Sequence, residues 1–243
     1  MEQNCCVERK SIGNNYSWKV NESLGLLGLF YGSNLIISLL VRSLWQADDP
    51  RLDHLVPYLS LAAYFLAALL LGLVFSLRYL KMREFDLKQS LYLSFPGLKG
   101  IVSALLLAGF LVVGHVFLIW FFQPDISPSP LLNLLEDGWI PLFLFIAIAL
   151  IIGPFTEEVL FRACLYDAFK SQLGLIPAGL LVSLLFAALH LPQHPLVFGV
   201  LFLYSLVFVW LREQSGSLIP SVVAHLAVNS SAILMRILIK IAL

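Results

Sequence analysis

Long apolar segments constrain the fold of this chain more than any other feature. Of its 243 residues, 60% are hydrophobic and only 12% are charged, whereas soluble proteins carry about 25% charged residues. A helix that spans a bilayer needs about 20 predominantly apolar residues, and we identify about seven such segments. The sequence therefore predicts an all-α fold, a polytopic transmembrane helical bundle.

The apolar segments set the predicted organisation of the chain. We place spans at residues 24–45, 55–79, 98–122, 139–170, 175–191, 195–212 and 217–241. The stretch 81–97 is rich in Lys and Arg and is predicted to be an interfacial helix. The stretch 124–130 contains three prolines and is predicted to be a loop. We divide the chain into a polar N-terminal tail, 1–23, and a single membrane domain, 24–243.

The basic residues predict an orientation. If the N-terminus is cytoplasmic, the inner segments carry ten Lys and Arg residues and the outer segments four, as the positive-inside rule requires. The first 22 residues are polar and lack the apolar core of a signal peptide, so we expect the first apolar segment to remain as an anchor. The formal net charge is zero, so we expect membrane lipids as partners and no nucleic acid.

Two adjacent glutamates, Glu157 and Glu158, lie inside the fourth apolar segment, after nineteen residues without a charge. Carboxylates at such a depth are costly and are usually functional. Arg162 follows Glu158 by four residues and shares its helix face, whereas Glu157 is turned by about 100°. We therefore expect Arg162 to neutralise Glu158 and to leave Glu157 available for chemistry. Pro154 is predicted to kink this helix and to free a carbonyl.

Further polar residues interrupt the fifth and seventh segments. His190 ends the fifth, and His225 and Asn229 share one face of the seventh. If the chain turns near residues 173 and 215, Glu157 and His190 lie at about the same height. His225 and Asn229 then lie roughly 15–21 Å from their turn. These four residues can meet in one layer within the membrane.

Three short motifs carry a family resemblance. They are Glu-Glu-x-x-x-Arg at Glu157, Glu158 and Arg162, Phe-x-x-x-His at Phe186 and His190, and His-x-x-x-Asn at His225 and Asn229. Together they resemble the CPBP family of intramembrane endopeptidases, the CAAX protease and bacteriocin-processing family, which is related to the Ras-converting CAAX endopeptidase. The resemblance covers residues 139–241, the motif-bearing core. Many family members have Gly after the motif arginine, where this chain has Ala163.

The resemblance implies an active site and a reaction. Glu157 would be the general base, His190 would help it to hold the attacking water, and His225 with Asn229 would stabilise the oxyanion. Glu158, Arg162 and Phe186 would support these catalytic residues. The implied activity is that of a glutamic-type, membrane-embedded endopeptidase. Its substrate would be a membrane-associated protein or peptide, with or without a lipid group. We expect the plasma (inner) membrane of a bacterium as its location.

Other interpretations remain open at this point. Glu157, His190 and His225 have side chains that suit zinc, but the His-Glu-x-x-His signature is absent, and we expect no cofactor. The polar groups could instead form a buried ion cluster in a non-catalytic chaperone, immunity or scaffold protein, or relay protons in a transporter. The sequence names neither the substrate nor the oligomeric state.

Overall fold

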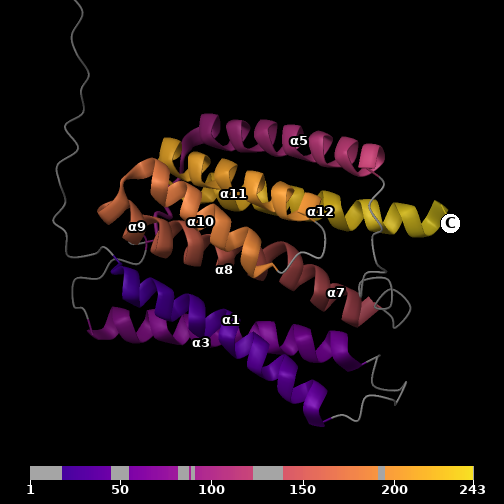
Figure 1. Cartoon of the computed structure of the whole chain (residues 1–243), viewed down its shortest axis with the longest axis horizontal. Coiled ribbons are helices and arrows are strands. Elements are labelled where there is room, and N and C mark those ends of the chain that lie inside the picture. Colours follow the sequence, from indigo (N-terminus) through magenta and orange to yellow (C-terminus); the bar gives the residue numbers. More distant parts are fainter. Residues whose placement is uncertain are drawn as a thin grey trace, which may run out of the picture.

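The computed structural model describes residues 18–44, 55–81, 88, 91–122, 139–190 and 195–242, and its regular elements in these ranges are helical (Figure 1). The helices are α1 (Val20–Leu44), α3 (Leu55–Lys81), α5 (Gly97–Phe122), α7 (Trp139–Ala147), α8 (Gly153–Glu158), α9 (Tyr166–Leu173), α10 (Leu175–Leu189), α11 (Pro195–Ser215) and α12 (Ile219–Ala242). Two π-helical segments, η1 (Ile148–Ile152) and η2 (Val159–Leu165), join α7, α8 and α9 without a break. The all-α prediction is confirmed.

Several helices are long and apolar enough to cross a membrane. By length and composition, three qualify among the described residues: Gly97–Leu118, Leu142–Leu173 and Pro195–Ser215. Shorter apolar helices cover Ala62–Gly72, Leu175–Leu189 and Ile219–Met235. Large apolar side chains remain exposed along these helices, as lipid contact requires, for example Leu106, Phe110 and Ile176. The helices are consistent with the predicted polytopic bundle.

The element boundaries differ from the sequence prediction in two places. Helix α1 begins at Val20, inside the stretch predicted to be a polar tail. Residues 91–96, predicted to belong to an interfacial helix, form a turn instead. The remainder of that predicted helix lies largely outside the described residues, as do the proline-rich loop at 124–130 and the tail up to residue 17.

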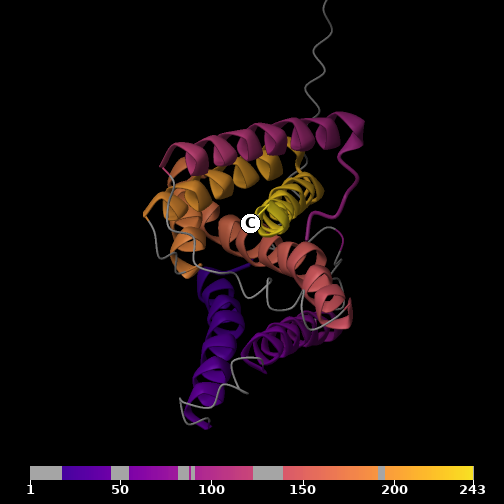
Figure 2. The same cartoon turned by 90° about the vertical axis from the view of Figure 1, so that its right-hand side faces the viewer.

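The continuous segment 139–173, which we call the glutamate helix, lies in the middle of the bundle. Helices α1 and α3 pair with each other on one side of it, and α11, α12 and α5 lie on the other (Figures 1 and 2). Contacts reach it from both sides: α3 touches η1 and α7, α1 touches η2, and α12 touches η1 and α8. Side chains on α8 are therefore surrounded by helices that are distant in sequence.

Two glycines form the turns on which the predicted depth of the polar residues depends. Gly174 joins α9 to α10 with φ 84°, and Gly216 lies between α11 and α12 with φ 62°. Both values fall in the left-handed region, which residues with a Cβ adopt at a cost. The turns lie where the sequence placed them, near residues 173 and 215. The two helical hairpins therefore bring their polar residues to similar depths.

The π-helical segment before the glutamates has a local cause. The N–H of Gly153 bonds the carbonyl of Ile148, five residues back. In the same pattern Pro154 would bond Ala149, but proline has no N–H to donate. A Cβ at Gly153 would lie 2.9 Å from the Ile148 carbonyl oxygen, so glycine permits this close packing. The predicted effect of Pro154, a freed carbonyl, is present at Ala149.

A charged network lies at the end of the glutamate helix that is remote from α7. Asp167 receives a bond from Arg212 Nη2 at 2.5 Å. Glu213 receives bonds from Lys170 Nζ at 2.5 Å and from the Tyr166 hydroxyl at 3.2 Å. These five residues, which we call the end network, connect α9 to α11. Each carboxylate in it is directly bonded to a cation.

The turn at residues 91–96 is attached to the end network. The guanidinium of Arg212 lies 3.9 Å from the ring centre of Tyr92, which adopts φ 53°. The Tyr92 carbonyl accepts a bond from the N–H of Leu218, and Ser217 Oγ donates to the Ser94 carbonyl. Burial, followed by the charge of Asp167, raises the pKa of Tyr92 to about 12. The phenol is therefore neutral near pH 7 and packs the turn against α11 and α12.

Candidate active site

Glu157 is the centre of a cluster built from four segments of the chain. Its Oε1 accepts a hydrogen bond of 2.8 Å from the hydroxyl of Tyr64 on α3. Its Oε2 lies 3.6 Å from His190 Nε2, at the end of α10, and 3.7 Å from His225 Nε2, on α12. The two oxygens thus have different surroundings: one is bonded to a phenol, and the other faces two imidazoles.

Glu158 is fully buried and has a different role from its neighbour. Its Oε1 lies 3.0 Å from Arg162 Nη1 and 2.9 Å from His225 Nδ1. The side chains of Glu158 and Arg162 are both inaccessible to solvent. The ion pair expected from the four-residue spacing is present. The carboxylate of Glu158 also contacts His225, one of the two histidines that face Glu157.

Arg162 is held in a pocket of aromatic rings. Its guanidinium carbon lies 4.7 Å from the ring centre of Phe186 and 5.2 Å from that of Phe208. Nη2 donates to Ser205 Oγ at 2.8 Å. Cation–π contacts of this kind are strongest where water is excluded. Phe186 also packs against His190, with ring centres 4.4 Å apart, so one aromatic ring supports both the ion pair and a histidine facing Glu157.

The partners of the two histidines assign their protons. His190 Nδ1 lies 2.7 Å from the carbonyl oxygen of Phe186, which can only accept, so this nitrogen carries the proton. His225 Nδ1 faces the carboxylate of Glu158, which likewise accepts. In each neutral ring the lone pair is then on Nε2, the nitrogen that faces Glu157. The separations of 3.6 and 3.7 Å exceed ordinary hydrogen-bond length, so neither Nε2 atom is hydrogen-bonded to Oε2 in this arrangement.

Asn229 lies on the same face of α12 as His225 but contacts a different part of the glutamate helix. Its Nδ2 donates at 3.0 Å to the carbonyl of Ala149, the carbonyl left without a donor by Pro154. An amide nitrogen has two N–H groups, so one remains for a further acceptor. The structure therefore gives Asn229 a bond that stabilises the π-helical segment, and its predicted role at an oxyanion stays a prediction.

The alternative zinc interpretation concerns the same three side chains. Glu157, His190 and His225 offer the atom types of a zinc site, and their Oε2 and Nε2 atoms converge. Among the described residues, however, no group of three His, Cys, Asp or Glu side chains has the arrangement to hold a metal ion. The expectation that the protein needs no metal stays a prediction.

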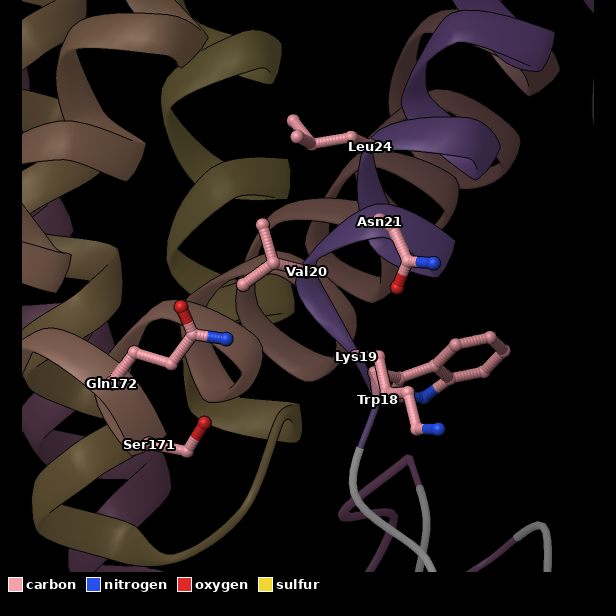
Figure 3. Close-up of a pocket in the computed structure, with 7 residues that line it drawn as sticks. All are labelled: Trp18, Lys19, Val20, Asn21, Leu24, Ser171 and Gln172. Atoms are coloured by element: carbon pink, nitrogen blue, oxygen red, sulfur yellow. The ribbon is translucent and has the colours of Figure 1, made fainter.

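A cavity of about 490 Å³ lies elsewhere, between the start of α1 and the end of α9. Figure 3 shows its lining, which consists of Trp18, Lys19, Val20, Asn21, Leu24, Ser171 and Gln172. None of the predicted site residues belongs to this lining. We therefore do not associate the cavity with the glutamate cluster.

The structure brings together the residues that the motifs singled out and adds one that they missed. Glu157, His190 and His225 meet around Oε2, and Asn229 contacts the turn before the glutamates. Tyr64 was not anticipated. It lies about 14 Å into α3 at 1.5 Å per residue, and a tyrosine so far from a membrane surface needs a polar partner. That depth was the available signal.

The comparisons with known proteins concern the same part of the chain. Residues 138–231 match the model of the family described as Type II CAAX prenyl endopeptidase Rce1-like. A protein of Bacillus subtilis (strain 168) named "Putative membrane peptidase YdiL" is 26% identical over 95 residues, which is 39% of this chain and 38% of the relative. The chain thus matches well under half of the relative's length. No solved structure matches significantly.

Proposed function

We propose that this chain is an intramembrane endopeptidase that uses a glutamate-activated water. The match of residues 138–231 to the CAAX-type membrane protease family and the apolar helices, which suit an integral membrane protein, support the proposal. One observation carries the proposal: Glu157 Oε2 and the Nε2 atoms of His190 and His225, which come from three different helices, converge within 3.6 and 3.7 Å.

In the proposed reaction, a water donates hydrogen bonds to Glu157 Oε2 and to the lone pair of His190 Nε2. Its oxygen attacks the peptide carbonyl carbon while one of its protons passes to Glu157. The tetrahedral intermediate then collapses as the C–N bond breaks and Glu157 returns this proton to the leaving amine. The products are a carboxylic acid and an amine, and no oxidant or metal enters the balance.

The oxyanion requires a donor, and this sets the charge of His225. Since Nδ1 of His225 is directed at Glu158, its Nε2 can donate only when the ring is an imidazolium. Two carboxylates, Glu157 and Glu158, would then be balanced by Arg162 and His225. Donors aimed at a developing oxyanion act strongly where water is scarce. The second N–H of Asn229 is the other proposed donor.

The experiment is comparative proteomics of membrane proteins and peptides from cells that carry either the wild type or Glu157→Gln. The variant keeps the shape of the side chain and can still accept from Tyr64, but it cannot take a proton. We expect intact substrates to accumulate in the variant and their fragments to be absent. Unchanged fragments at equal protein levels would overturn the proposal. Retained cellular function in Glu157→Ala would instead favour a chaperone, immunity or scaffold role.

Metal independence is part of the proposal and is tested separately. The purified protein is treated with a strong chelator, its metal content is measured, and cleavage of an identified substrate is followed. We expect full activity without bound metal. Activity that disappears with the chelator and returns on addition of zinc would show instead that Glu157, His190 and His225 act as zinc ligands.

We further propose that the protein lies in the bacterial inner membrane with a cytoplasmic N-terminus. We propose that its substrate is membrane-associated, with or without a lipid group.

A further inference from the structure

The N-terminal hairpin of α1 and α3 lies outside the residues that match the peptidase family, 138–231, yet it reaches the proposed catalytic carboxylate. The contact is made by Tyr64, whose hydroxyl donates to Glu157 Oε1 at 2.8 Å. Among the bonds described for Glu157, this is the one of ordinary hydrogen-bond length. The two histidines lie farther away, at the other oxygen.

The phenol of Tyr64 packs where Gly153 of the glutamate helix has no side chain. A Cβ added at Gly153 would lie 3.3 Å from the Tyr64 hydroxyl and 3.7 Å from the adjacent ring carbon. The tyrosine therefore packs directly on the backbone one turn before Glu157. On its other side, the ring meets Phe30 of α1 edge to face, with centres 5.0 Å apart. Phe30 is fully buried, so the phenol is held from both sides.

We propose that Tyr64 is a positioning residue, which holds Glu157 Oε1 so that Oε2 stays between His190 and His225. A glutamate side chain has several rotatable bonds, and a carboxylate can present either oxygen. With Oε1 bonded to a phenol fixed by α1 and α3, the oxygen that takes the proton is defined before substrate binds. Preorganisation of this kind affects the rate more than the binding of substrate. This inference rests on the proposed function and adds a residue that the three motifs do not contain.

The test compares two tyrosines of the same hairpin. Tyr64→Phe removes the hydroxyl that bonds Glu157. Tyr31→Phe removes a buried hydroxyl that has no hydrogen-bond partner among the described residues and serves as the matched control. The probe is the peptide that accumulates in cells carrying Glu157→Gln. We expect Tyr64→Phe to lower kcat about 10- to 100-fold, the effect of one hydrogen bond to a charged group, with KM within about twofold. We expect Tyr31→Phe to retain the wild-type kcat.

A second measurement needs no substrate. The antisymmetric carboxylate stretch of Glu157 is identified as the infrared band lost in Glu157→Gln. Loss of the hydroxyl that bonds Glu157 should shift this band in Tyr64→Phe. The band should keep its position in Tyr31→Phe. An unmoved band in Tyr64→Phe, or equal losses of kcat in both variants, would overturn the inference. If Tyr64→Phe shifts the band but the wild-type protein cleaves no substrate, the proposed function is overturned and the contact between Tyr64 and Glu157 stands.

Discussion

The glutamate helix contributes to two charged clusters, and they are built differently. In the end network, Asp167 and Glu213 are bonded directly to Arg212 and Lys170 at 2.5 Å. Around Glu157, a phenol is the one group at hydrogen-bonding distance among the described residues, and two histidine nitrogens lie farther away, at 3.6 and 3.7 Å. The carboxylates of the end network are held in direct ion pairs, which suits a structural role. Oε2 of Glu157 has no partner at hydrogen-bonding distance among the described residues, which leaves it able to accept a proton in the proposed reaction.

The most direct way to break this comparison is to neutralise one carboxylate in each cluster. We expect Glu157→Gln to lower kcat by at least about 100-fold, because it removes the proposed general base. Glu213→Gln should leave kcat within roughly twofold, since that side chain only joins α9 to α11. Both are measured on purified protein, with gel filtration to verify folding. A similar loss of activity in the two variants would mean that the clusters do not differ in function.

The next largest effect should follow from removing one buried arginine. Arg162→Leu leaves Glu158 without its main counter-charge at a position with no solvent access. Breaking a buried pair in this way costs about 3–5 kcal/mol, and we expect a loss of that order in the free energy of unfolding. Arg212→Leu should cost less, because Asp167 retains 15% of its side-chain exposure. Reversible unfolding in detergent measures both, and a larger cost at Arg212 would reverse the ranking.

A smaller effect should connect Asn229 to Pro154. Asn229→Ala removes the donor to the Ala149 carbonyl, and the loss of one such bond costs about 1 kcal/mol. Pro154→Ala restores an N–H at position 154 that can bond the same carbonyl. The cost of Asn229→Ala should therefore fall in the Pro154→Ala background. Strictly additive free energies of unfolding in the double-mutant cycle would show that the two residues do not share this carbonyl.

The smallest effect should come from the exposed edge of the end network. The side chain of Lys170 retains 35% of its exposure beside Glu213, and ion pairs near a surface contribute about 0–1 kcal/mol. We expect Lys170→Met to change the free energy of unfolding within that range and to leave kcat unaltered. A loss of kcat with normal stability would give the end network a part in catalysis and remove the distinction between the two clusters.

The sequence predicted the motif geometry because the rules that govern it are local. Spacing by four residues placed Arg162 on Glu158, and counting residues from a turn near 173 put His190 level with Glu157. Contacts between elements distant in sequence were not predictable in this way. Tyr64 lies in an apolar run with no motif around it, so nothing in the sequence indicated that α3 would approach η1. The bond from Asn229 to Ala149 depends on a π-helical pattern that apolar periodicity does not distinguish from an α-helix.

The two π-helical segments have a consequence for changes in chain length. Each wide turn contains more residues than an α-helical turn of the same height, and these segments lie on both sides of the glutamates, at 148–152 and 159–165. Removing one residue from the first segment would tighten it toward an α-helix and rotate the lipid-facing surface of α7. The glutamates and everything after them would keep their orientation. The helix can therefore absorb a single-residue deletion in the segment 148–152 without turning the carboxylates away from the histidines.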